Sequence, residues 1–233
     1  MTDVTQTTLL YERLRVAILD LDLAPGMRLT ERWLEAEFNA SRTPVRAALA
    51  RLEGEGLAQR DGRGWIVSPL DLGELEALAE YRVAIESAVV RLAIERATDV
   101  ELAALEAHVR SPDLASTPRD STHVAPEFHV ELARLSGNPF LLSAVEGIMT
   151  RLARTRWLEV HTLSGSVEAG IEHAEILGAL LARDAVNAAT LAVEHIQRTS
   201  SRVSESLRSN RKGFTARGVS IVGTGDRGIL PRP

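Results

Sequence analysis

The chain has 233 residues, of which 45% are hydrophobic and 25% charged, a composition that argues against both a disordered chain and a membrane protein. Aromatic residues are sparse at 4%, which favours a mostly α-helical fold, and the absence of cysteine excludes disulfides, thiolate zinc sites and cysteine nucleophiles. The net charge of −5 argues against a nucleic-acid partner if the charge is spread evenly along the chain.

The N-terminal segment predicts three helices. Apolar residues recur at helical spacing from Leu9 to Leu21, and Ala24-Pro25-Gly26 ends this helix. Thr30 has the position of an N-cap residue for a second, short helix. A third helix begins near Ser41 and ends at about Gly54-Glu55-Gly56. This helix has one apolar face, and Arg42 and Arg46 lie one turn apart on another face.

A short β-hairpin is expected after the third helix. Asp61-Gly62-Arg63-Gly64 forms a turn between two strand-like segments, residues 57–60 and 65–67. The order of these elements is that of a winged helix-turn-helix domain, whose third helix reads DNA.

Ser68-Pro69 ends this domain, and residues 70–208 predict six or seven helices that form an all-α bundle. Residues 209–233 are rich in Gly, Ser, Arg and Pro without helical periodicity, which indicates a disordered basic tail. The predicted fold is therefore mostly α, with domains at 1–69 and 70–208 and a tail at 209–233.

The charge follows these boundaries. Residues 1–69 carry nine arginines and ten acidic residues. Residues 70–208 carry 13 arginines and 21 acidic residues, and residues 209–233 carry five basic residues and one acidic residue. The net charges are −1, −8 and +4. Because the acidic excess belongs to the helical domain, the total charge does not exclude a DNA partner.

Motifs in both domains resemble those of one bacterial family. The motif Ser41-Arg42-Thr43-Pro44-Val45-Arg46 and its flanking residues resemble the DNA-binding domain of the GntR family. Motifs of the helical domain resemble the FCD-type ligand-binding domain of the FadR-like subfamily; they are Arg82 with Glu86, Phe128-His129, Ser136-Gly137-Asn138, Glu172-His173 and Glu194-His195. The resemblance implies a homodimeric transcription regulator that binds a palindromic operator, acts as a repressor and responds to a small organic acid.

The candidate DNA contacts are Arg32, Ser41, Arg42, Thr43, Arg46, Gly62 and Arg63. Side chains at the start of the third helix can reach base edges, and Ser41 with backbone amides can hold a phosphate. The resemblance implies a phosphate contact for Arg32 and a wing contact for Gly62 and Arg63.

Three histidines match the ligands of a divalent metal in the metal-binding members of this subfamily: His129, His173 and His195. Neutral imidazoles suit Zn, Ni, Cu or Mn. The aspartate that these members place one turn before the first histidine is replaced by Ala125, and Pro126 disfavours a helix interior there.

Several interpretations of the histidines remain open. Asp120 or His123 could replace the missing carboxylate, whereas Glu127 faces away, and water or the carboxylate of the effector could complete a three-histidine site. Without metal, the histidines could bind an anionic effector directly, together with Arg151 and Arg154. Each histidine could also be a buried core residue without a ligand.

Two alternative functions are weaker. A metal-bound water could make the chain a hydrolase-like enzyme, but no general base is well placed and the DNA-binding domain is then unexplained. A protein-binding winged domain does not explain the exposed arginines. We therefore predict a regulator without enzymatic activity. The absence of an apolar run of ~20 residues or a basic secretory leader further predicts a cytoplasmic protein without a membrane partner.

Overall fold

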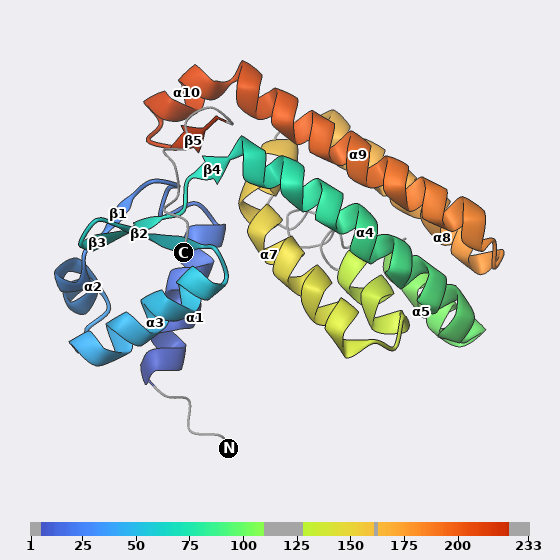
Figure 1. The fold of residues 1–233 in the computed structure, drawn as a ribbon, viewed down its shortest axis with the longest axis horizontal. Helices are drawn as coiled ribbons and strands as arrows, with labels where there is room; N and C mark the ends of the chain where they lie inside the picture. The colour runs from blue at the N-terminus through green and yellow to red at the C-terminus, as the bar shows by residue number, and fades with distance from the viewer. Residues whose placement is uncertain (1–5, 110–127, 161–162, 224–233) are drawn as a thin grey trace. The chain divides into compact units, whose positions relative to one another are not determined.

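Figure 1 shows the computed structural model, which describes residues 6–109, 128–160 and 163–223. The chain divides into two compact units, one formed by Met1–Leu72 with Asn210–Pro233 and the other by Gly73–Ser209. None of the described helices is long and apolar enough to cross a membrane.

The first unit contains a winged helix-turn-helix fold. Its elements are α1 (Gln6–Leu19), β1 (Arg28–Leu29), α2 (Glu31–Glu37), α3 (Arg42–Gly54), β2 (Ala58–Asp61) and β3 (Gly64–Val67). The strands form an antiparallel sheet in the order β1-β3-β2, with Arg60 opposite Trp65. Leu14 of α1, Leu49 of α3 and Trp65 of β3 belong to one buried cluster. The mostly α fold with an N-terminal winged domain is therefore confirmed.

Local sequence explains where the second and third helices begin. The hydroxyl of Thr30 accepts a hydrogen bond from the Trp33 amide at 3.2 Å, which caps α2 as predicted. Ser41 has the extended backbone of an N-cap residue, with φ −79° and ψ 167°, but its side chain makes no capping hydrogen bond to α3. The Ser41 hydroxyl is therefore not used to start the helix.

The segment after Ser209 corrects the prediction of a disordered tail, because its described part, up to residue 223, is ordered. It forms α10 (Arg211–Ala216) and β5 (Ile221–Val222), and β5 pairs in parallel with β4 (Leu70–Asp71). Phe214 and Ile221 are buried. Two buried apolar residues are too few to produce a helical periodicity in the sequence. The strand β5 also forms only by pairing with a segment about 150 residues earlier, so the local residue pattern could not predict this ordered segment.

The same segment is bonded to the start of the winged domain. The Ser220 amide donates to the Pro25 carbonyl at 2.8 Å, and the Leu70 amide donates to the Ser220 carbonyl at 2.9 Å. Gly26, with φ +88°, packs so closely on Ser220 that a Cβ at this position would collide with the serine Cβ. The C-terminal strand is thus an integral part of the DNA-binding unit.

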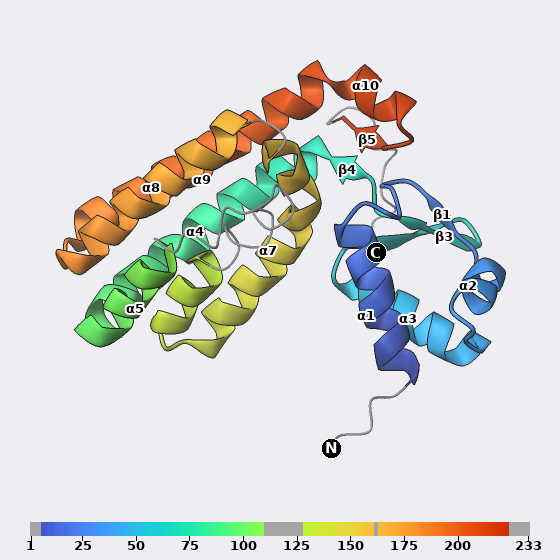
Figure 2. The same ribbon diagram turned by 180° about the vertical axis from the view of Figure 1, so that it is seen from behind.

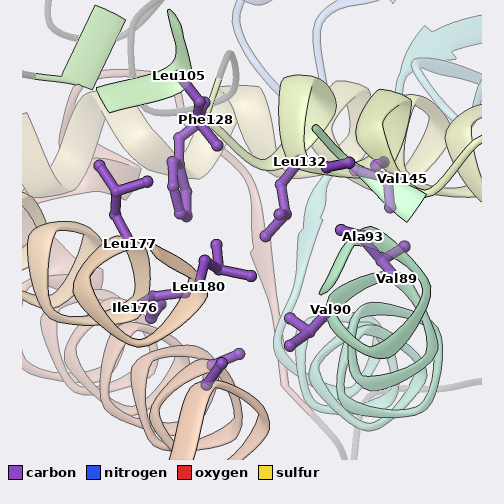
Figure 3. Close-up of a cluster of buried hydrophobic side chains, with 14 of the residues drawn as sticks. Val89, Val90, Ala93, Leu105, Phe128, Leu132, Val145, Ile176, Leu177 and Leu180 are labelled. Carbon is purple, nitrogen blue, oxygen red and sulfur yellow. The ribbon is translucent and has the colours of Figure 1, made fainter. Parts of the chain in front are cut away.

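The second unit is all helical. It contains α4 (Leu72–Arg96, the first residue of which belongs to the other unit), α5 (Asp99–Val109), a helix over residues 128–135, α7 (Pro139–Val160), α8 (Leu163–Leu181) and α9 (Ala185–Ser209). In Figure 2, α8 and α9 lie side by side. Figure 3 shows the core between the helices, with Val90 and Ala93 from α4, Leu132 from the 128–135 helix, and Leu177 and Leu180 from α8. Burying each leucine contributes about 2 kcal/mol, so this core holds the site-bearing helices together.

Candidate DNA-binding surface and candidate metal centre

The exposed side of α3 carries the predicted DNA contacts. Val45, Ala48 and Leu49 are buried, whereas Arg42 and Arg46 are 66% and 60% exposed. Both guanidiniums bind Glu31 of α2: Arg42 Nε lies 2.6 Å from Oε2 and Arg46 Nε lies 2.8 Å from Oε1. The helix therefore has the apolar and basic faces that its sequence predicts, and α2 supplies an acidic partner that the sequence analysis missed.

The other predicted contacts of this unit are also exposed. Ser41, Thr43 and Arg32 lie on the surface, and Gly62 adopts φ +57° in the turn that carries Arg63 between β2 and β3. A glycine at this position accommodates the left-handed backbone without strain. The turn is therefore built as a wing, and its contact with DNA stays a prediction.

Three buried histidines converge in the helical unit. His129 lies on the 128–135 helix, His173 on α8 and His195 on α9. Their Nε2 atoms are 3.2 Å apart in all three pairs. Sequence reasoning predicted these residues to share a site, and the structure brings them together.

Two carboxylates orient this histidine cluster. His129 Nδ1 lies 2.7 Å from Glu86 Oε2, and His195 Nδ1 lies 2.7 Å from Glu172 Oε2. Each carboxylate therefore holds a proton on Nδ1, which leaves the Nε2 lone pair directed at the centre of the cluster.

Arginines in turn hold both carboxylates. Arg82 Nε donates to Glu86 Oε1 at 2.7 Å, and Arg202 Nη1 donates to Glu172 Oε1 at 3.1 Å. The Arg82 Nη2 atom also lies 3.2 Å from His129 Nε2. Arg82 is therefore both a support for Glu86 and a direct neighbour of the histidine cluster.

The pKa values of these groups suit cation binding. Burial lowers the pKa of His129 to about 3, despite the opposing charge of Glu86, and burial also lowers the pKa of His195. Burial alone would raise the pKa of Glu172, but the hydrogen bonds from His195 and Arg202 lower it to about 2. Near neutral pH the two histidines are thus neutral and this carboxylate is ionised.

The donor set fits a divalent metal ion. A tetrahedral zinc with Zn–N bonds of about 2.0–2.1 Å requires nitrogen atoms about 3.3–3.4 Å apart, and the observed separations are 3.2 Å. Converging lone pairs repel one another unless a proton or cation lies between them. Three protein ligands leave a coordination position open, and a bound ion would replace the contact between Arg82 Nη2 and His129 Nε2.

The predicted substitutes for the missing aspartate, Asp120 and His123, lie outside the described residues, as do Ala125, Pro126 and Glu127. The structure therefore describes a three-histidine donor set and gives no position for a fourth protein ligand.

The two candidate effector arginines differ in environment. Arg151 Nη1 is paired with Glu74 of α4 at 2.7 Å. Arg154 is buried, and burial lowers its pKa to about 10, against the opposing charge of Glu74. Arg82, which the sequence pointed to only as part of a family motif with Glu86, contacts the histidine cluster through His129.

A small cavity lies beside Arg82. Its volume is about 30 Å³, and its lining comes from α4, α7 and α9: Leu75, Ala79, Arg82, Leu152, Thr155, Thr199, Ser200 and Val203. A space of this size holds about one water molecule.

Each of the two units matches a known protein family. Residues 6–67 match the family described as bacterial regulatory proteins, gntR family, and residues 77–198 match the FCD domain. The chain belongs to the GntR family of transcriptional regulators. This GntR protein is 34% identical over 187 residues to the Nta operon transcriptional regulator of Aminobacter aminovorans, an alignment covering 79% of this chain and 88% of that protein.

Further relatives of this GntR regulator extend the match. The HTH-type transcriptional repressor RspR of Escherichia coli is 27% identical over 210 residues, covering 88% of this chain and 92% of that protein. The solved structure of E. coli McbR/YncC has a TM-score of 0.71 and 22% identity, covering 87% of this chain and 99% of that chain, which shows a shared fold. The predicted family is confirmed, and the chain is a DNA-binding regulator and not an enzyme.

Proposed function

We propose that this GntR regulator is a cytoplasmic, homodimeric repressor that responds to a metabolite. Residues 1–69 bind one half of a palindromic operator, and residues 70–208 carry the dimerisation and effector-binding functions. A two-fold dimer matches two half-sites related by the same symmetry. The effector is a small carboxylate metabolite that binds the two dimer geometries with different affinity and so changes the DNA affinity.

The convergence of three buried histidine nitrogens in the helical unit is the observation that supports effector sensing most directly. We infer that His129, His173 and His195 hold one divalent ion, of Zn, Ni or Mn, and that Arg82 lies at the edge of the same site. When bound, the ion supplies a Lewis-acid position for a carboxylate oxygen of the effector. Arg151 and Arg154 are the further candidate contacts for that anion.

The DNA-binding proposal can be tested with Arg46→Ala. Operator fragments are first recovered by genome-wide DNA pull-down with the wild-type protein. We expect the variant to lose roughly tenfold to a hundredfold in affinity for a recovered fragment, because one bidentate base contact is lost. Arg91→Ala, which removes an exposed arginine of α4, is the control and should bind normally. Unchanged affinity for Arg46→Ala would refute the assignment.

The metal proposal can be tested on protein purified without an affinity tag. We expect elemental analysis to find about one divalent ion per chain in the wild type, since three histidines form a single donor set. His173→Ala should contain little or none. If neither sample contains metal, the metal proposal is wrong, and the histidines either bind the effector directly or are core residues without a ligand.

A further inference from the structure

Glu31, the first residue of α2, connects the two arginines that begin α3. Its two carboxylate oxygens are divided between them, since Oε2 binds Arg42 Nε at 2.6 Å and Oε1 binds Arg46 Nε at 2.8 Å. The Glu31 side chain is only 19% exposed, whereas both guanidiniums are mostly exposed. The largely buried carboxylate of Glu31 thus holds the exposed guanidiniums of Arg42 and Arg46 by the edge that faces the domain.

The contact uses one edge of each guanidinium. Glu31 accepts from Nε, and within the described ranges of the chain the Nη groups of Arg42 and Arg46 make no hydrogen bond to protein. The two Nη groups of an arginine can donate end-on to O6 and N7 of guanine. The pairing therefore leaves free the pair of donors that recognises this base.

Glu31 is a charged group under physiological conditions. Hydrogen bonds from Arg46 and Arg42 lower the pKa of its carboxyl group, and its position in the first turn of α2 adds the favourable field of the helix N-terminus. An anion beside a DNA-binding face weakens attraction to phosphates. Its presence there reduces affinity for any DNA, and orienting the two arginines is a benefit that can offset this loss.

We propose that Glu31 is a positioning residue that sets base specificity: it orients Arg42 and Arg46 for end-on recognition of guanine in the major groove and disfavours their use as mobile phosphate ligands. This inference rests on the proposed DNA contacts of α3. In the unpaired state, each arginine side chain samples many rotamers and can reach phosphates of any sequence. Paired with Glu31, the two guanidiniums are held before DNA arrives.

The test compares Glu31→Gln with Glu37→Gln in the full-length protein. Both variants remove one negative charge from α2, but the Glu37 side chain is exposed and makes no hydrogen bond or ion pair to any residue that the structure describes. The probes are a duplex selected by the wild-type protein from a random-sequence library and a scrambled duplex of the same length and composition. Fluorescence anisotropy measures both affinities between about 50 and 200 mM salt.

For Glu31→Gln we expect the ratio of selected to scrambled affinity to fall roughly tenfold, because the arginines lose their orientation. Its binding to the scrambled duplex should strengthen, and the slope of log K against log salt should steepen by up to about 0.9, the value for one added phosphate contact. Repeating the library selection with this variant should show weaker preference at guanine positions. Glu37→Gln should raise both affinities equally and keep the ratio.

An affinity ratio for Glu31→Gln equal to that for Glu37→Gln would overturn the inference. Arg46→Ala separates this outcome from failure of the proposed DNA contacts: if that variant loses selected-duplex binding while Glu31→Gln keeps the ratio, only the positioning role is wrong. Glu31→Asp retains the charge but is too short to reach both arginines, so it should also lower the ratio. Thermal unfolding verifies that each variant is folded.

Discussion

The Nδ1 atom of His195 lies 2.7 Å from Oε2 of Glu172, a contact that joins α9 to α8. Arg202 binds both oxygens of the same carboxylate, at 3.1 and 3.2 Å. The position of Glu172 is therefore fixed from a second side. This arrangement holds the His195 ring in one orientation and makes its Nε2 atom the free ligand.

Replacing Glu172 by Gln should lower the metal affinity of the protein about 10- to 100-fold, because the orienting carboxylate and its charge are lost. Isothermal titration of chelator-treated protein with Zn²⁺ or Ni²⁺ measures this affinity. Glu175→Gln, an exposed change on the same helix, should have no effect. Equal affinities for the two variants would contradict the role assigned to Glu172.

Replacing Arg82 by Met should strongly destabilise the helical unit. Arg82 and Glu86 are each 4% exposed, and the change leaves a buried carboxylate without its arginine. Loss of one partner of a buried ion pair costs about 3–5 kcal/mol in the free energy of unfolding, measured by urea titration. Arg91→Met breaks the exposed pair with Glu95 on the same helix and should cost at most about 1 kcal/mol. An equal loss in the free energy of unfolding for both variants would contradict the stabilising role of the buried Arg82–Glu86 pair.

The metal-free protein should lose stability as the pH falls below about 6.5. Burial keeps the pKa of His129, about 3, and that of His195 below the unfolded value, so the unfolded chain binds protons that the folded chain does not. At pH 5.5, about one unit below the unfolded pKa, neutral His129 costs about 1.4 kcal/mol, and His195 adds a cost of the same sign. Urea titrations of chelator-treated protein at neutral and acidic pH measure the difference. His129→Gln should show a weaker pH dependence, and an equal dependence would argue against a neutral, buried His129.

Replacing Gly26 by Ala should destabilise the DNA-binding unit through two effects: backbone strain at φ +88° and collision with Ser220. Gly218→Ala provides the control, because φ is +82° but no atom lies within 4 Å of the added Cβ. Strain alone costs about 1–3 kcal/mol, so thermal unfolding should show a larger loss for Gly26→Ala. Adding Ser220→Gly should recover the difference. If it does not, the C-terminal segment does not pack on Gly26.

Residue pattern was sufficient for the three helices and the hairpin of the winged domain, but it did not predict β1, which pairs with β3. The Thr30 cap, the two faces of α3 and the Gly62 turn follow from interactions between residues a few positions apart, which propensity and periodicity describe directly. The histidines of the helical unit were identified by their family motifs, which predicted that they share a site.

Spacing along the chain could not reveal the partners of those histidines. Glu86 is 43 residues from His129, and Glu172 is 23 residues from His195, so their hydrogen bonds exist only after the helices pack. The same holds for β5, which pairs with β4 about 150 residues away. Local sequence selects helices and turns because the relevant forces act within one or two turns. The directions of the Nε2 lone pairs, and the carboxylates that set them, depend on how side chains from separate helices fill a common core.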